Sequence, residues 1–230
     1  IPTIEDRLIQ QCFLQVLEPI CEAKFHDRSY GFRPLRSAQN AMAVYYKLIQ
    51  QMDLFYVVDV DIKGFFDNIS HGKLLRQMWA IGIRDKKVIS IISAMLKAEV
   101  AGIGFPEKGT PQGGIISPLF ANIYLHELDK FVAQLSKNFF SQPDARRAPE
   151  YRAIEHKLYK TSKEIKIATQ EERAKLIEKY KLLKKELLKT PCKKQTDKKI
   201  KYIRYADDFI MGVNGSKEDC VRIKAKLSDF

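Results

Sequence analysis

The strongest pattern in the chain is a strict alternation over residues 54–62, which predicts a β-strand with two different faces. The first face carries Tyr56, Val58, Val60 and Ile62, and the second carries Phe55, Val57, Asp59 and Asp61. The first set is expected to pack on helices. The second set ends in two carboxylates, at positions where a purely structural strand would carry Thr or Val. These carboxylates are therefore candidates for chemistry.

A second acidic pair lies in residues 201–213, which read KYIRYADDFIMGV. Runs of β-branched and aromatic residues flank Tyr205–Asp208, and this arrangement predicts a β-hairpin with Asp207 and Asp208 at or beside its turn. Adjacent carboxylates repel each other and are poor strand formers. A divalent cation bound to them would remove that repulsion. The alternative is a solvated turn, because Asp is common in turns.

Apolar residues at helical spacing predict helices over much of the remaining chain. The expected segments are residues 3–17, ended by Pro19; a helix that begins after Ser37; 70–80; 85–98; a long helix from Ser117; and a lysine-rich helix or helix pair over 149–189. A glycine-rich stretch, residues 102–114, precedes the long helix. Gly113 and Gly114 let the backbone approach a partner closely beside a helix N-terminus, a place that suits phosphate. Taken alone, this pair also fits an ordinary turn.

Charge changes the picture by indicating the class of partner. The chain has 230 residues and a net charge of +12, and residues 141–204 hold 20 Lys and Arg against 9 Asp and Glu. This local surplus of positive charge, beside an acidic candidate metal site, favours a nucleic-acid partner. The length and apolar content suit one large domain or two small subdomains with a real core.

Composition also excludes several classes of protein. No apolar run approaches the roughly 18 residues that a membrane span needs, and no signal-peptide pattern is present. The four cysteines have no CxxC spacing, which indicates free thiols in a reducing compartment and hence the cytoplasm. Because the four His residues are scattered singly, a His/Cys metal site is not expected. The chain has no initiator Met and ends in a helical pattern, so we expect it to be part of a longer protein.

Four segments bring these features together and resemble the sequence blocks of one family. They are YGFRPLRSAQNA at 30–41, VDIKGFFDNISH at 60–71, GTPQGGIISPLFANIYLHELD at 109–129 and IRYADDF at 203–209. In this order and spacing, the chain resembles the reverse transcriptase domain of group II intron-encoded maturases from about residue 1 to residue 213.

The resemblance implies an α+β fold of the right-hand polymerase type, with an antiparallel palm sheet backed by helices. It assigns residues 1–52 to the fingers. It assigns residues 53–230 to the palm with some fingers elements, including a basic helical insertion at about 136–200. The thumb and later domains are expected to lie outside this chain.

The resemblance also implies that Asp61, Asp207 and Asp208, with the backbone carbonyl of Ile62, hold two Mg²⁺ ions, for which Mn²⁺ can substitute. Mg²⁺ takes oxygen ligands in near-octahedral geometry. Two such ions about 4 Å apart activate the primer 3′-hydroxyl and neutralise the departing pyrophosphate, so no protein nucleophile is required. Asp59 competes with Asp61 because strand alternation puts both on one face. The family pattern places the ligand directly before Ile-Lys-Gly and so favours Asp61.

Other matched positions are expected to contact the nucleotide and the nucleic acid. Phe66 matches the aromatic residue that lies under the incoming sugar and excludes a 2′-hydroxyl; its alternative is a core position, which fits Phe65 at least as well. Gln112 and Gly113 match the nucleotide-contacting PQG block, and the alternative for Gln112 is a polar residue at the start of a helix. The expected nucleic-acid contacts are Arg33, Arg36, Lys184, Lys185, Lys193 and Lys194.

The implied function is an RNA-directed DNA polymerase that uses an RNA template, a DNA primer and dNTPs. The complete protein would also bind intron RNA and assist splicing and retrohoming, whereas this chain alone would polymerise poorly. No membrane partner is expected, and a homo-oligomer is left open. One alternative is a non-catalytic RNA-binding splicing cofactor; another is a different reverse transcriptase lineage or an RNA-dependent RNA polymerase. The three carboxylates favour activity, and Phe66 argues against an RNA product.

Overall fold

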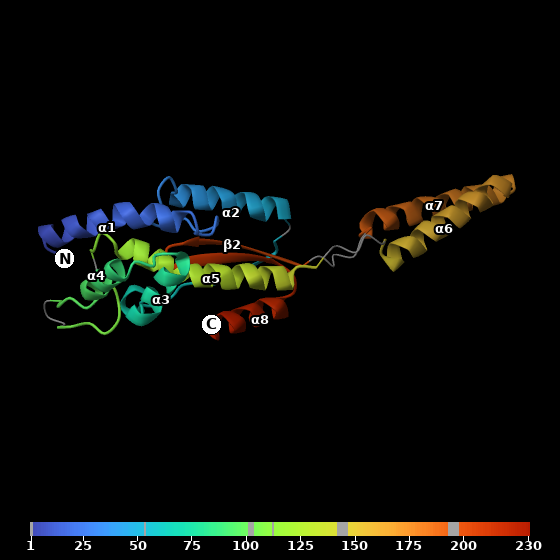
Figure 1. Ribbon diagram of the computed structural model, residues 1–230. Coiled ribbons are helices and arrows are strands. Elements are labelled where there is room, and N and C mark those ends of the chain that lie inside the picture. The colour runs from blue at the N-terminus through green and yellow to red at the C-terminus, as the bar shows by residue number, and fades with distance from the viewer. Residues whose placement is uncertain (1, 53, 101–103, 112, 142–146, 193–197) are drawn as a thin grey trace. The chain divides into compact units, whose positions relative to one another are not determined.

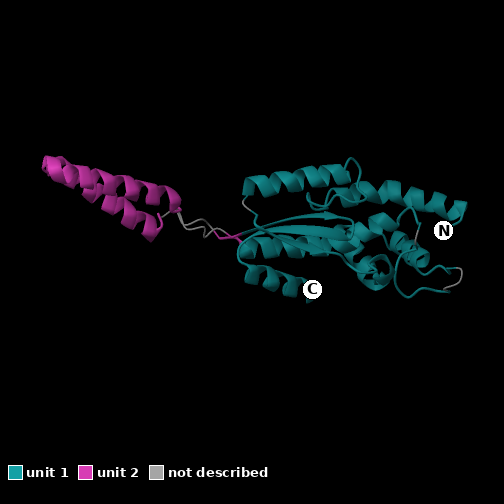
Figure 2. Cartoon of the chain, turned by 180° about the vertical axis from the view of Figure 1, so that it is seen from behind, with its two compact units in different colours: residues 1–139, 199–230 teal, residues 140–198 magenta. Residues whose placement is uncertain are grey.

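A computed structural model describes residues 2–52, 54–100, 104–111, 113–141, 147–192 and 198–230, and the chain divides into two compact units (Figure 2). Unit 1 consists of residues 1–139 and 199–230, and unit 2 consists of residues 140–198. The helices of unit 1 are α1 (Ile4–Glu22), α2 (Ala38–Met52), α3 (His71–Ile81), α4 (Lys86–Leu96), α5 (Ser117–Phe139) and α8 (Lys217–Ser228), with a short 3₁₀ turn, η1, at Phe66–Asn68. Unit 2 contains α6 (Pro149–Ile167) and α7 (Gln170–Lys189). The assignment of residue ranges to fingers and palm stays a prediction.

A three-stranded antiparallel sheet lies at the centre of unit 1, counted over the described residues. Its strands are β1 (Tyr56–Val60), β2 (Lys199–Tyr205) and β3 (Asp208–Asn214), and β3 lies between the other two. β2 and β3 form a tight hairpin in which Tyr205 pairs with Asp208. β1 pairs with β3 so that Val60 lies opposite Phe209. The mixed α+β class and the predicted strand and hairpin are confirmed.

Helices cover the two faces of the sheet unequally (Figure 1). On one face, Val58 and Met211 are buried in the main core together with residues of α5 and α8. On the other face, α2 forms a smaller core with Leu54 and Ile203. This second face stays open along β1 and at the hairpin turn, where Val57 and Tyr205 are 55% and 40% exposed. The uncovered part of the sheet is therefore the side that carries Asp59 and Asp61.

The predicted end of the first helix is wrong, because Pro19 lies inside α1 instead of after it. Proline lacks a backbone N–H, so the carbonyl four residues earlier loses its helical partner. Gln15 and Pro19 are both exposed, and water can satisfy that carbonyl at the surface. The predicted boundaries of α3 lie close to the observed ones. The Ser70 side chain caps the start of the helix, and Gly82, with φ +123°, ends it.

Unit 2 is a pair of packed helices with a small core of its own. Ile154, Leu158 and Thr161 of α6 are buried, whereas α7 has no buried residue. The half-buried side of α7 carries Leu176, Tyr180, Leu183 and Leu187. The helix pair predicted over residues 149–189 is thus confirmed. None of the described helices is long and apolar enough to cross a membrane.

Candidate active site

The predicted carboxylates meet at the end of the sheet where β1 stops and the hairpin turns. Continuing the β1–β3 register by one residue sets Asp61 opposite Asp208. Residues directly opposite in an antiparallel pair lie on the same face, with Cβ atoms about 4.5–5.5 Å apart. Asp59 lies on that face too, opposite Ile210. Asp207 occupies the turn between β2 and β3.

This acidic cluster changes the titration of Asp208, whose pKa is raised above its ordinary value of 3.8. Loss of solvation contributes most, followed by the negative charges of Asp207 and Asp61, a hydrogen bond with Asp61 and the charge of Asp59. Like charges around a carboxyl group disfavour its ionised form. A divalent cation would compensate the same charges, so the environment favours cation binding.

The donor set fits a hard divalent cation, although the described residues contain no group of three His, Cys, Asp or Glu side chains already arranged around one metal position. Asp61 and Asp208 offer carboxylate oxygens from facing positions. Mg²⁺ is usually bound through one or two carboxylates and keeps several waters. Asp61, Asp208 and the carbonyl of Ile62 are therefore the groups that would hold an ion, with Asp207 next to them on the turn.

A buried polar network supports the hairpin turn from within unit 1. Arg204 has no exposed surface, and its Nε and Nη2 donate to the two carboxylate oxygens of Asp129 at 2.9 Å each. Its Nη1 donates to the carbonyl of Ala206 at 2.7 Å and to Oδ1 of Asn122 at 3.1 Å. The Tyr202 hydroxyl donates to Asp129. We call Arg204, Asp129 and Asn122 the Arg204 network, and Tyr202 lies beside it.

The loop after α1, which consists of residues 23–37, packs directly against the same turn. The Tyr30 amide donates to the carbonyl of Arg204 and the Arg204 amide donates to the carbonyl of Arg28, both at 2.9 Å, so this loop runs alongside β2. A Cβ atom at Gly31 would lie 2.2 Å from the backbone nitrogen of Ala206. Ala206 has φ +56°, a conformation that L-residues rarely adopt. Glycine at position 31 thus leaves room for a hairpin turn with an unusual backbone conformation.

Phe65 and Phe66 occupy different environments. Phe65 is 6% exposed and packs against the ring of Tyr124 in the core. Phe66 is half-buried and contacts Phe65 and Phe32, with ring centroids 5.5 and 6.3 Å apart. The core position therefore belongs to Phe65, which leaves Phe66 as the residue accessible to a ligand.

The glycine-rich segment reaches this aromatic pair through its backbone. The Thr110 amide donates to the carbonyl of Phe66 at 2.9 Å, and the Gly109 amide donates to the carbonyl of Ile69 at 2.8 Å. Gly113, further along, is exposed and has φ +79°. Gln112, the predicted nucleotide contact, lies outside the described residues.

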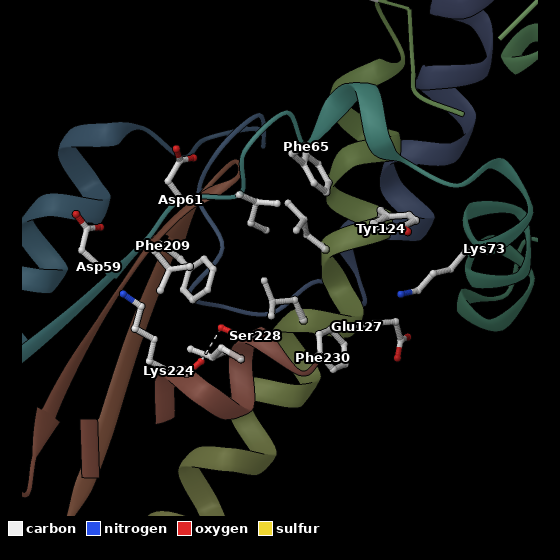
Figure 3. Close-up of a pocket in the computed structure, with 15 residues that line it drawn as sticks. Asp59, Asp61, Phe65, Lys73, Tyr124, Glu127, Phe209, Lys224, Ser228 and Phe230 are labelled. Atoms are coloured by element: carbon white, nitrogen blue, oxygen red, sulfur yellow. Dashed lines mark hydrogen bonds between the residues drawn. The ribbon is translucent and has the colours of Figure 1, made fainter. Parts of the chain in front are cut away.

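A cavity of about 460 Å³ lies next to β1 but belongs to the other side of the strand (Figure 3). Apolar side chains such as Val60, Phe209 and Leu128 form much of its wall. The carboxylates of Asp59 and Asp61 lie at its edge and are directed away from this apolar interior. Because these carboxylates are directed away from the cavity, we place the candidate site on the open face of the sheet.

Comparison with known proteins decides the family. The family model described as reverse transcriptase (RNA-dependent DNA polymerase) matches residues 1–142. The chain belongs to the reverse transcriptase family. It is 44% identical over 238 residues to the group II intron-encoded protein LtrA of Lactococcus lactis subsp. cremoris, an alignment that covers 100% of this chain and 38% of LtrA.

The names of two further relatives of the chain also refer to introns. An uncharacterised 91 kDa protein in the cob intron of Schizosaccharomyces pombe is 35% identical over 98% of this chain and 27% of its own length. Nuclear intron maturase 2, mitochondrial, of Arabidopsis thaliana is 25% identical over 98% of this chain and 33% of its own length. The chain therefore spans between about a quarter and two fifths of these relatives, and it is related to group II intron-encoded proteins and intron maturases.

The expected nucleic-acid contacts of this reverse transcriptase have contrasting surroundings. Arg33 is 7% exposed; its guanidinium pairs with Glu22 at 2.7 Å and also donates to the carbonyls of His26 and Ser29. This geometry gives Arg33 a structural role in holding the loop after α1 and does not favour the expected contact with RNA. Arg36 is half-buried and lies over the ring of Tyr30 at 5.3 Å.

The four lysines expected to bind nucleic acid belong to unit 2. Lys184 and Lys185 are exposed on α7. Lys193 and Lys194 lie outside the described residues. The two described lysines are thus accessible to a polyanion.

Sequence reasoning missed the Arg204 network, although two signals for it were present. Arg204 occupies a position of β2 whose neighbours along the alternation, Tyr202 and Ile200, are buried. Asp129 falls on the stripe of α5 that also carries Leu128 and Val132. A lone charge at a core position of a strand and another at a core position of a helix predict a buried ion pair.

Proposed function

We propose that this reverse transcriptase is an RNA-directed DNA polymerase that transfers nucleotides with the help of two Mg²⁺ ions, and that the protein also binds intron RNA and assists its splicing. The observation that carries the proposal is the facing position of Asp61 and Asp208, with Asp207 beside them, at the open end of the sheet. The raised pKa of Asp208 supports it, because the surrounding negative charges favour a bound cation. The similarity to a group II intron-encoded protein and to an intron maturase supports the choice of RNA partner.

Each residue of the site has a part in the proposed reaction. The bound ions would activate the primer 3′-hydroxyl and neutralise the charge on the triphosphate. Asp61 and Asp208 hold the ions from two adjacent strands, and Asp207 adds negative charge at the turn. Phe66, five residues after Asp61 and half-buried, would exclude a 2′-hydroxyl by its bulk. The exposed backbone at Gly113 approaches the phosphates.

Primer extension by the complete protein on an RNA template with Mg²⁺ and dNTPs tests the proposal. We expect Asp61→Asn and the double variant Asp207→Asn/Asp208→Asn to lose about 1,000-fold or more of the rate, because they remove metal ligands. Asp59→Asn is the matched control: it removes a carboxylate from the same face of β1, and most of the rate should remain.

Two results would contradict this assignment. An inactive Asp59→Asn variant beside an active Asp61→Asn variant would transfer the ligand role to Asp59. A wild-type protein that binds RNA tightly and extends no primer would favour the non-catalytic splicing cofactor.

We further propose that unit 2 contacts the backbone of intron or template RNA. Most of the positive surplus of residues 141–204 lies in this unit, and Lys184 and Lys185 are exposed on a helix that has no buried residue. A helix that contributes so little to a core is free to present its charged side to a partner. When lysines contact RNA phosphates, counterions are released from the RNA. The affinity of the protein for RNA therefore depends on the salt concentration, which makes this proposal testable.

A further inference from the structure

We infer that the Arg204 network positions the metal-binding turn, so that Arg204 determines how well the protein binds a divalent cation without touching the cation itself. The inference rests on the proposed function. Among the described hydrogen bonds, the side chains of the network reach the turn at the carbonyl oxygen of Ala206, which accepts from Arg204 at 2.7 Å. Ala206 directly precedes the Asp207-Asp208 pair.

The network connects helix α5, strand β2 and the loop that contains Gly31 to the carbonyl of Ala206. Asp129 and Asn122 belong to α5, and Arg204 belongs to β2. Asn122 also donates through Nδ2 to the carbonyl of Gly31 at 2.9 Å. Gly31 in turn packs on the backbone of Ala206. The turn is therefore held between a helix and a loop by hydrogen bonds that all pass through Arg204 or its partner Asn122.

The chemistry of the guanidinium explains why arginine is needed here. Its planar fork donates two parallel hydrogen bonds to the Asp129 carboxylate and has a third nitrogen left for Ala206 and Asn122. Lysine has one nitrogen on a flexible stem and cannot reach all of these acceptors at once. Burial alone would lower the pKa of Arg204, but the hydrogen bonds and charge of Asp129 raise it, so the group stays charged.

A purely stabilising role does not account for this arrangement well. Replacing a buried ion pair by apolar residues of similar volume is often neutral or stabilising, so a buried pair is weak evidence for stability. Here the pair ends on a turn whose residue Ala206 has φ +56°. Strained backbone persists only where its surroundings fix it, and it is concentrated at functional sites. The Arg204 network is the surrounding structure that fixes this turn.

The test compares Arg204→Lys with Tyr202→Phe in the same protein. Tyr202→Phe is the matched control, because it removes a buried hydrogen bond to Asp129 beside the network, and none of the described side-chain hydrogen bonds of Tyr202 reaches the turn. Mn²⁺ binding is measured by electron paramagnetic resonance of the free ion, and primer extension gives kcat and the Mg²⁺ concentration at half-maximal rate. Circular dichroism establishes that each variant is folded.

We expect Arg204→Lys to weaken Mn²⁺ binding by about tenfold or more and to raise the half-maximal Mg²⁺ concentration, while the dNTP KM changes little. A misplacement of about 1 Å is enough for a 100-fold effect on rate. Tyr202→Phe should lower the melting temperature and leave Mn²⁺ affinity within about twofold of wild type. A folded Arg204→Lys variant with wild-type Mn²⁺ affinity and wild-type kcat would overturn the inference.

A second variant keeps the test decisive if Arg204→Lys does not fold. Asn122→Ala keeps the Arg204–Asp129 pair but removes the hydrogen bonds to Arg204 and to Gly31. Weaker Mn²⁺ binding by this variant supports the inference, and unchanged binding overturns it. Failure of the proposed function is separate: a wild-type protein that binds Mn²⁺ but extends no primer refutes the polymerase, while the Mn²⁺ affinities still judge the Arg204 network.

Discussion

At the scale of single residues, Asp208 links the chemistry of the site to the stability of the protein. Its pKa is raised in the folded state by loss of solvation and by the charges of Asp207, Asp61 and Asp59. The folded state therefore binds this proton more tightly than the unfolded state does. The stabilising contribution is present below the ordinary pKa of 3.8 and is lost as the pH rises through the raised value. At neutral pH the ionised group destabilises the metal-free protein.

We predict that Asp208→Asn raises the melting temperature of the metal-free protein at pH 7 by roughly 1–3 °C, because it removes like-charge repulsion. The gain should shrink as the pH falls toward 4, where Asp208 is increasingly protonated in the wild type. Thermal melts followed by circular dichroism at both pH values measure it. Glu99→Gln, an exposed carboxylate far along the chain from the cluster, is the control and should show no such trend. A gain that does not depend on pH would contradict this account.

At the scale of elements, the hairpin turn and the loop after α1 act as one piece. Gly31 approaches Ala206 so closely that a Cβ atom would meet backbone at 2.2 Å, and backbone cannot move aside as a flexible side chain could. We predict that Gly31→Ala displaces the turn and lowers the rate of primer extension by about 100-fold. Gly72→Ala, where no described atom outside its chain neighbours and its own helix backbone lies within 4 Å of the added Cβ, is the control and should keep its rate. The pair of rates is measured on samples of matched melting temperature.

A further comparison separates a local effect from unfolding. Gly31→Ala should leave the far-ultraviolet circular dichroism spectrum unchanged, because helices α3 to α5 do not depend on the turn. Extension at the wild-type rate by Gly31→Ala would show that the turn tolerates displacement.

The elements themselves were predictable wherever the signal is local. The alternation over residues 54–62 and the hairpin around Asp207 are read from neighbouring residues. Both elements are present, although the strand is limited to Tyr56–Val60. Pro19 was misread, because the exposed side of a helix tolerates a lost hydrogen bond that a buried side would not.

The site was less predictable where it depends on contacts between distant residues. The carboxylates could be chosen by pattern, but Asp129 lies 75 residues from Arg204, and their pairing follows only from the packing of α5 on β2. Phe65 and Phe66 are adjacent and identical in kind, so only the fold shows which one enters the core. The surroundings of Arg33 depend on the fold in the same way, since its partner Glu22 comes from another element.

At the scale of the whole molecule, the chain contains two units with separate cores, and unit 2 is inserted into unit 1. The two ends of unit 2 meet at a backbone bridge: the Ser141 amide donates to the carbonyl of Lys198 at 3.1 Å, and the Lys198 amide donates to the Ser141 side chain at 2.8 Å. Ends this close can be joined by a short flexible linker without stretching the rest of the chain. Unit 1 should therefore fold without the helices of unit 2.

We predict that replacing residues 142–197 by a four-residue Gly-Ser linker preserves the unfolding transition of unit 1 and weakens RNA binding. The slope of log affinity against log salt should fall by about 0.7–0.9 for each phosphate contact that is lost. Lys184→Gln/Lys185→Gln in the intact protein should reproduce part of the change, while Lys184→Arg/Lys185→Arg keeps the charge and should keep the slope. Fluorescence anisotropy titrations between 50 and 200 mM salt, conditions over which such slopes are clear, measure it. An unchanged slope after excision would assign RNA binding to unit 1, whose acidic site would then need its own basic surface to hold the template.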